Sequence, residues 1–153
     1  MLSEPHDELR VASFRDLDVT SLYEILKLRS EVFVVEQECP YLDPDGRDTE
    51  PGTRHIWFEK DGTIRAYLRV LSDQDVERIG RVITAPDARG KGLAGRLIEE
   101  ALTVIGSRTS VLDAQAHLSD FYGRFGYVIN GDEYLEDGIP HVPMIRAGST
   151  PAR

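Results

Sequence analysis

The chain has 153 residues, a net charge of −9 and 41% hydrophobic residues, which suits one domain with a sizeable buried core. This acidic balance argues against nucleic acids and anionic membrane surfaces as partners, and no apolar run approaches the ~20 residues that span a bilayer. One cysteine cannot form an intrachain disulfide, and residues 1–10 carry no apolar signal segment, so we expect a cytoplasmic protein. We expect a single domain over residues 1–153, with a core at about 8–147 and a loose tail over 148–153.

The predicted elements follow the order β-α-β-β-β-α-β-α-β-β, which is typical of a mixed α/β sheet. Turn chemistry gives the clearest boundaries. Asp61-Gly62 between two strand patterns predicts a type I′ hairpin, and Gly106 ends an apolar helical stripe. Ser21 and Glu24 form a capping-box pattern that opens the first helix. The predicted strands span residues 9–14, 54–60, 63–71, 77–84, 110–114, 127–134 and 141–146, and the helices begin at residues 21, 93 and 118.

The segment over residues 37–53 is long for a loop in a compact domain, and such loops are often functional. Acidic side chains cluster here, with Arg47 as their only nearby basic residue. The cluster predicts either a site for a cation or a solvated face. A calcium site is disfavoured because the distal bidentate glutamate is not at its required position. The acidic residues are Glu36, Glu38, Asp43, Asp45, Asp48 and Glu50.

A basic turn rich in glycine joins the strand over residues 77–84 to the next helix. Gly90 and Gly92 have no Cβ, so an anionic ligand can approach the backbone there. The first amides of the helix have no partner within the helix, and the helix dipole adds partial positive charge. The side chains of Arg89, Lys91 and Arg96 surround the same place. The turn therefore predicts a phosphate site.

Three kinds of phosphate site are compatible with a turn of this composition. A nucleoside-triphosphate loop requires Gly-Lys followed by Ser or Thr, and that hydroxyl is missing here. The dinucleotide pattern G-x-G-x-x-G is matched by Gly90, Gly92 and Gly95, but a segment containing Pro86 separates it from the strand, and too few residues follow for a full dinucleotide domain. The third alternative is the diphosphate of coenzyme A.

A second motif follows the predicted strand that ends at Ala114. It consists of a turn, a short helix and a glycine stop before the next strand. Aromatic residues lie inside the helix and on both sides of the glycine. These residues are Phe121, Tyr122, Phe125, Gly126 and Tyr127.

Together the two motifs resemble those of the Gcn5-related N-acetyltransferase (GNAT) superfamily. The first motif is Arg89-x-x-Gly92-x-Ala94 after a strand, and the second is the aromatic pattern described above. Gln115 stands where the superfamily usually has Asn, and Leu118 where it often has Ala. Four further segments resemble the ElaA-like branch of the superfamily: residues 28–37, 39–48, 114–117 and 137–141.

The resemblance implies a GNAT fold, with a mixed sheet of six to seven strands, flanking helices and splayed central strands. It also implies transfer of an acetyl group from acetyl-CoA to a primary amine, without a metal, and a homodimer would be usual. The strand before the glycine turn is expected to leave amides unpaired for the pantetheine arm. The residues that the resemblance assigns to coenzyme binding are Arg81, Val82, Ile83, Thr84, Arg89, Gly90, Lys91, Gly92, Leu93, Ala94, Gly95 and Gln115.

The same resemblance assigns Tyr122 as the general acid. Proton transfer from a phenol of pKa ~10 to a thiolate of pKa ~8.5 costs about 2 kcal/mol, so we expect assistance rather than absolute need. The base must offset a larger cost, about 4.6 kcal/mol, because an alkylamine of pKa ~10.4 is almost fully charged at pH 7. Glu36 at the end of the first helix and His117 before Tyr122 are the candidates. His55 and His141 lie on predicted strands and are weaker ones.

Three functions therefore compete. The favoured one is an acetyl-CoA-dependent N-acetyltransferase whose acceptor is a small-molecule or protein amine of cationic character. The second is a coenzyme A-binding sensor without turnover, and the third is a dinucleotide oxidoreductase. Thiol release from acetyl-CoA in the presence of amines would separate the first two, and protection from unfolding by NAD would favour the third.

Overall fold

A computed structural model describes residues 6–149 of the protein. One sheet runs through it in the order β1-β2-β3-β4-β5-β8-β6, with β7 also pairing with β8. Neighbouring strands are antiparallel except where β4 meets β5. The strands are β1 (Glu8–Ser13), β2 (Arg54–Lys60), β3 (Thr63–Ser72), β4 (Glu77–Thr84), β5 (Ser110–Gln115), β6 (Val128–Ile129), β7 (Tyr134–Glu136) and β8 (Ile139–Arg146).

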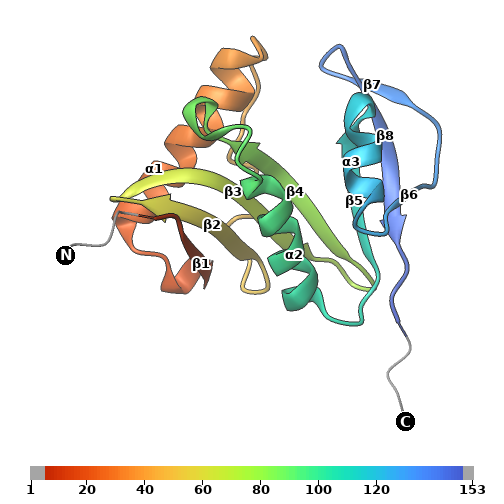
Figure 1. Ribbon diagram of the computed structural model, residues 1–153, viewed down its shortest axis with the longest axis horizontal. Coiled ribbons are helices and arrows are strands. Elements are labelled where there is room, and N and C mark those ends of the chain that lie inside the picture. The colour runs from red at the N-terminus through yellow and green to blue at the C-terminus, as the bar shows by residue number, and fades with distance from the viewer. Residues whose placement is uncertain (1–5, 150–153) are drawn as a thin grey trace.

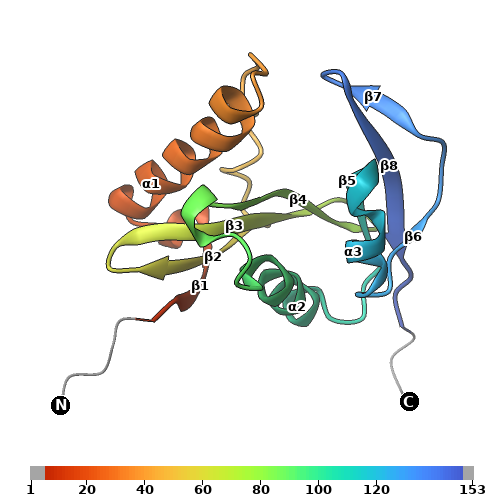
Figure 2. The ribbon, with the colours of Figure 1, turned by 45° about the horizontal axis from the view of Figure 1, so that its top comes forward.

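Helices cover both faces of the sheet. Figure 2 shows α1 (Val19–Arg29) on one face of strands β2 to β4 and α2 (Leu93–Ile105) on the other. The apolar stripe predicted for α2 is confirmed, because Leu97, Ile98 and Ala101 are fully buried. The short helix α3 (Ser119–Gly123) lies beside β5 and β6 (Figure 1). The core is thus continuous from α1 through the sheet to α2.

Local turn chemistry explains the boundaries that the sequence predicts correctly. Asp61 and Gly62 both have positive φ, at 51° and 75°, as a type I′ turn requires. Gly106 ends α2 with φ 66°. The predicted capping box is wrong, because the side chain of Asp18 caps α1 by accepting a 2.6 Å hydrogen bond from the amide of Ser21. Beyond α1 the chain continues as a π-helix over Ser30–Glu36.

The sheet has eight strands rather than six or seven because the strand predicted over residues 127–134 is divided. Its two parts, β6 and β7, pair with opposite ends of β8. Between them Asn130 donates a hydrogen bond to Pro143 O. Gly131 lies so close that an added Cβ would be 2.7 Å from Pro143 Cγ. The proline on β8 therefore interrupts the pairing.

No helix over residues 6–149 is long and apolar enough to cross a membrane. The cytoplasmic location and the homodimer expected from the sequence stay predictions. The proposed loose tail falls mostly on residues 150–153, outside the described residues.

Candidate active site

Strands β4 and β5 pair at one end and separate at the other. Their paired residues are Glu77 with Ser110 and Arg78 with Val111, and the pairing stops there. Beyond this point the two halves of the sheet diverge, as Figure 1 shows. The splayed central strands predicted from the sequence are therefore present.

A β-bulge in β4 begins where the splay begins. Tyr67 pairs with Ile83 and Arg69 with Gly80, so one residue of β3 lies opposite two residues of β4. Within the bulge Arg81 has φ 52°, a left-handed conformation that an L-residue adopts at a cost of about 1–2 kcal/mol. A bulge bends its strand and increases the local twist, which turns β4 away from β5.

Two amides of β4 face the opening that results. Ala85 donates its N–H to Arg65 O on β3 at 2.8 Å. Because successive residues of a strand point in opposite directions, the N–H groups of Thr84 and Val82 face away from β3. Ile83 has the orientation of Ala85, and its side chain is buried. Within the predicted segment, the amides of residues 82 and 84 thus point away from β3.

The glycine turn lies next to this opening. Gly90 and Gly92 have φ 80° and 77°, and no heavy atom lies within 4 Å of a Cβ built on either residue. Gly92 is the N-cap of α2, and no side chain caps this end. The first amides of α2, from Leu93 onward, are therefore available to an anion.

The three basic side chains near the turn have different surroundings. Arg89 donates to both carboxylate oxygens of Glu36, at 2.7 and 2.8 Å, and its Nε donates to Thr84 O at 3.2 Å. Arg96 packs over the ring of Phe58, 4.5 Å from its centroid, and so points to β2. Lys91 forms no ion pair with any residue of the described range. Arg89 and Lys91 are thus the cations left at the turn.

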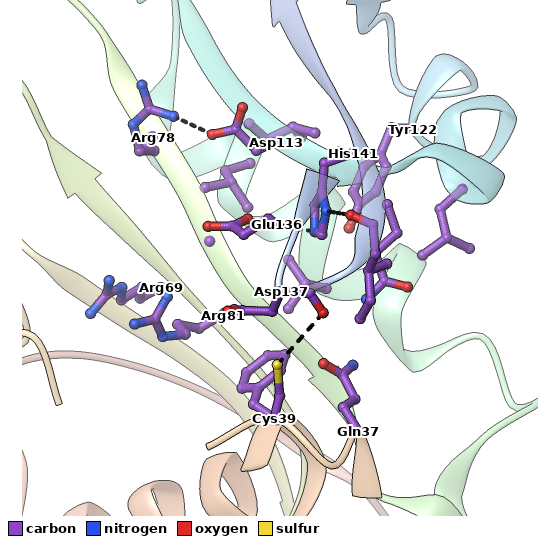
Figure 3. Close-up of a pocket in the computed structure, with 18 of the residues that line it drawn as sticks. Gln37, Cys39, Arg69, Arg78, Arg81, Asp113, Tyr122, Glu136, Asp137 and His141 are labelled. Atoms are coloured by element: carbon purple, nitrogen blue, oxygen red, sulfur yellow. Dashed lines mark hydrogen bonds and ion pairs between the residues drawn. The ribbon is translucent and has the colours of Figure 1, made fainter. Parts of the chain in front are cut away.

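A cavity of about 390 Å³ lies between the two halves of the sheet. Its walls come from β3, β4, β5 and α3, from the segment after α1 and from the β7–β8 hairpin, as Figure 3 shows. Of the predicted site residues, Arg81, Val82, Gln115 and Tyr122 line it. The wall also includes Gln37, Cys39, Arg78, Asp113 and Glu136, together with His141, a weaker candidate base from the sequence.

Tyr122 reaches the cavity from α3 and is only 6% exposed. Its ring meets the rings of Phe121 and Tyr127 edge to face, which fixes its orientation. Burial, and secondarily the neighbouring Tyr127, raise the pKa of Tyr122 to about 12. The hydroxyl is therefore a hydrogen-bond donor at neutral pH.

Neither of the two main candidate bases from the sequence lines the cavity, whereas His141, one of the two weaker candidates, does. Glu36 lies at the end of the π-helix in its ion pair with Arg89, whose hydrogen bonds hold the pKa of the Glu36 carboxyl below its usual range. His117 lies in the exposed turn between β5 and α3. The structure instead brings His141 and Glu136 to the cavity wall, with His141 Nε2 3.7 Å from Glu136 Oε2.

A hairpin that the sequence analysis missed positions His141. Asp137 and Gly138 have φ 51° and 78° and join β7 to β8. This is the same Asp-Gly signal that identified the first hairpin, and it was available in the sequence. Pairing of β8 with β5 then places His141 opposite Gln115.

The sequence predicts that the acidic loop over residues 37–53 is either a cation site or a solvated face. Neither prediction holds for its aspartates, because they neutralise buried arginines. Arg29 has no exposed surface and donates to Asp43 and Asp48. Arg69 donates to Asp45 and Asp48. Burial raises the pKa of Asp48, but its hydrogen bonds from arginine outweigh this and lower it overall. The loop is thus an internal ion network, which only its three-dimensional contacts reveal.

The same network holds the bulge of β4. The guanidinium of Arg81 lies 2.9 Å from Asp43 Oδ1 and donates to Asp43 O at 3.0 Å. It also packs against the ring of Tyr41. These contacts fix the left-handed residue from outside the sheet. The side chain of Arg81 thus binds the acidic loop, so any contribution of Arg81 to coenzyme binding would come from its backbone.

Sequence comparisons identify relatives over almost the whole chain. A family model described as an acetyltransferase (GNAT) domain matches residues 31–147. The UPF0039 protein Rv2851c of Mycobacterium tuberculosis (strain H37Rv) is 50% identical over 148 residues, which cover 94% of this chain and 95% of that protein. Protein ElaA of Escherichia coli (strain K12) is 44% identical over 138 residues, which cover 86% of this chain and 90% of ElaA.

Solved structures give the same result. The crystal structure of an acyl-CoA N-acyltransferase from Pseudomonas aeruginosa matches with a TM-score of 0.90 and 42% identity, covering 93% of this chain and 100% of that one. Escherichia coli ElaA matches with a TM-score of 0.88 and 38% identity, covering 92% of this chain and 99% of that one. The chain therefore belongs to the GNAT acetyltransferase family as an ElaA-like member, with the fold of the N-acyltransferases.

Proposed function

We propose that the protein transfers an acetyl group from acetyl-CoA to a primary amine. One observation carries the proposal: β4 separates from β5 beside an uncapped helix N-terminus, and Tyr122 lines the cavity at that opening. The name of the Pseudomonas aeruginosa relative, an acyl-CoA N-acyltransferase, supports the coenzyme. The choice of acetyl among acyl groups belongs to the proposal.

Coenzyme A would bind along the glycine turn and β4. The diphosphate would accept hydrogen bonds from the first amides of α2 and face two cations of the turn, Lys91 and Arg89, of which Arg89 is paired with Glu36. The pantetheine arm would pair with the amides of Val82 and Thr84 in the manner of an added strand. Gln115 would contact the coenzyme from β5. The turn residues assigned to the diphosphate are Arg89, Gly90, Lys91, Gly92, Leu93, Ala94 and Gly95.

Two groups would stabilise the reaction at the thioester. A β4 amide that faces the opening can donate to the carbonyl oxygen as negative charge develops there. Tyr122 can donate to the sulfur as it leaves. Full proton transfer from a phenol of pKa about 12 to a thiolate of pKa ~8.5 is uphill by about 5 kcal/mol. Tyr122 therefore acts through its hydrogen bond, and the proton that neutralises the thiolate comes finally from the amine.

The charges around the cavity favour a cationic acceptor. Its arginines already have carboxylate partners: Arg69 and Arg81 in the loop network, and Arg78 with Asp113 at 3.0 Å. Glu136 and Asp137 on the β7–β8 hairpin form no ion pair with an arginine or lysine in the described part of the chain. The hairpin therefore presents net negative charge to an entering ammonium group.

Two measurements test the proposal. Calorimetry with coenzyme A should show binding, and a panel of primary amines (polyamines, amino sugars, amino acids and a peptide N-terminus) should release free thiol from acetyl-CoA. Binding without thiol release from any amine would favour a sensor that has the same coenzyme site. Absence of heat with coenzyme A would contradict the proposal altogether.

A further inference from the structure

We propose that His141 is the general base that accepts the proton of the acceptor's ammonium group, with Glu136 as its charge partner. This inference rests on the proposed function and assigns the step to a histidine that the sequence made a weaker candidate than Glu36 and His117. It is carried by the geometry of the β7–β8 hairpin, which places both side chains on the cavity wall shared with Tyr122 (Figure 3).

The hydrogen bond at Nδ1 fixes the tautomer of His141. Nδ1 lies 2.7 Å from Ile139 O, and a carbonyl oxygen can only accept, so Nδ1 carries the hydrogen. The neutral ring then has its lone pair on Nε2. This is the arrangement in which one ring nitrogen is anchored by the backbone while the other is free to take a proton.

Packing fixes the direction of the ring. The side chain is 12% exposed, and Tyr134 stacks on it with centroids 5.8 Å apart and an angle of 25° between the rings. His141 is also paired through the backbone with Gln115 on β5. The imidazole is therefore held in one orientation in the cavity wall, with Nε2 on the side of Glu136.

Glu136 lies where it would stabilise the charged ring. Its Oε2 is 3.7 Å from His141 Nε2, and 59% of its side chain is exposed. The carboxylate can attract the incoming ammonium and then balance the imidazolium. Glu36 and His117 lack such a position, because neither contributes to the cavity wall.

The step balances without a further reagent. The ammonium gives one proton to His141 Nε2, and the neutral amine nitrogen attacks the thioester carbon. The carbon–sulfur bond then breaks, the sulfur leaves with its electron pair, and the nitrogen loses its second proton. One proton converts the thiolate to a thiol and the other reaches solvent from His141, so the products are an amide, free thiol and one proton.

The test compares His141→Gln with the wild type, using the amine that gives the fastest thiol release in the panel. At pH 7 the substitution should lower kcat/KM for the amine about 100-fold or more, and the affinity for coenzyme A should change less than twofold. The exposed His6 lies outside the cavity, so His6→Gln serves as the matched control. Glu136→Gln should give a smaller loss than His141→Gln.

The pH profile separates a base from a merely structural residue. Without a base only the neutral amine reacts, so kcat/KM of His141→Gln should rise about tenfold per pH unit up to the pKa of the amine, whereas the wild type should level off earlier. A rate loss that is equal at every pH would overturn the assignment. The charged or titratable groups that line the cavity with His141 or stack on its ring are Glu136, Tyr134, Asp113, Arg78, Tyr122, Cys39, Asp137, Tyr41, Arg69 and Arg81.

Other outcomes are equally decisive. If the wild type turns over and His141→Gln is equally active, His141 is not the general base, but the proposed function still holds. If only His117→Gln lowers kcat/KM for the amine, the general base is His117, in the turn before α3. If the wild type binds no coenzyme A and releases no thiol with any amine, the proposed function and this inference both fail.

Discussion

Glu36 accepts two hydrogen bonds from the guanidinium of Arg89, at 2.7 and 2.8 Å. The pair joins the end of the π-helix to the start of the glycine turn, and both side chains are exposed, at 42% and 45%. The carboxylate thus occupies the hydrogen-bonding edge of the guanidinium that a diphosphate would need. If the coenzyme binds at the turn as proposed, Glu36 would compete with it for Arg89, which is a different role from that of a base.

Removing the carboxylate should therefore tighten coenzyme binding. Glu36→Gln is expected to increase the affinity for coenzyme A a few-fold and less than tenfold, because exposed ion pairs contribute little. Arg89→Ala should weaken it. Calorimetry at fixed ionic strength measures both, and Arg10→Ala, which breaks a distant exposed pair with Glu59, is the control. An unchanged affinity together with a large fall in kcat for Glu36→Gln would instead support a catalytic base.

Tyr122→Phe should lower kcat by about 10- to 100-fold while coenzyme affinity stays within twofold, because one hydrogen bond to the departing sulfur is lost. The ring and its edge-to-face contacts remain. Since burial raises the pKa of Tyr122 to about 12, the wild-type rate should show no loss from tyrosine ionisation below about pH 11. Steady-state thiol release across pH measures both effects. Full activity of Tyr122→Phe would eliminate the role.

Gly92→Ala should destabilise the fold by about 1–2 kcal/mol, because φ is 77° and an L-residue is strained there. The space around the residue is open, so the cost is conformational and not a steric clash. Gly123→Ala is the matched control: the glycine ends α3, has open space around it and has no positive φ. That change should leave stability unchanged or raise it by up to about 1 kcal/mol. Urea unfolding compares the two variants, and equal effects would contradict the explanation.

The parts of the fold that depend on local chemistry could be predicted from the sequence. The β2–β3 hairpin follows from Asp61-Gly62, and the end of α2 follows from Gly106, because a few residues determine each turn. The bulge at Arg81 could not be found in this way. Its left-handed residue is held by Asp43, 38 positions away in the chain. The spacing of apolar and polar residues does not predict such a long-range contact.

The candidate site divides in the same way. The glycine turn and Tyr122 belong to short motifs; in the structure the turn follows the end of β4 that is not paired with β5, and Tyr122 lines the cavity. The position of His141 depends on the pairing of β8 with β5, which joins residues 26 positions apart in the chain. The Asp137-Gly138 turn was the one local signal for it. Glu36 could be placed on its helix but not in its ion pair, because the partner comes from a distant turn.

A buried histidine beneath the acidic loop links stability to pH. His55 is 1% exposed. Its Nε2 lies 3.0 Å from Asp48 O, which can only accept, so Nε2 carries the hydrogen and Nδ1 accepts from Tyr67 Oη at 2.6 Å. The neutral ring is therefore fully hydrogen-bonded. Burial lowers the pKa of His55, and the nearby cations Arg29 and Arg69 act in the same direction although Asp48 opposes them.

This lowered pKa predicts a loss of stability as the pH falls below neutrality. The unfolded chain binds the proton at its ordinary pKa of ~6.5, whereas the folded chain resists it, so the contribution of His55 is complete above that value and declines below it. Between pH 7 and 5.5 the free energy of unfolding should fall by at most about 1 kcal/mol, the limit for a histidine that stays neutral throughout in the folded chain. Urea titrations at several pH values measure the slope. His55→Gln should flatten it and the exposed His6→Gln should not, whereas an equal slope in all three proteins would show that another group is responsible.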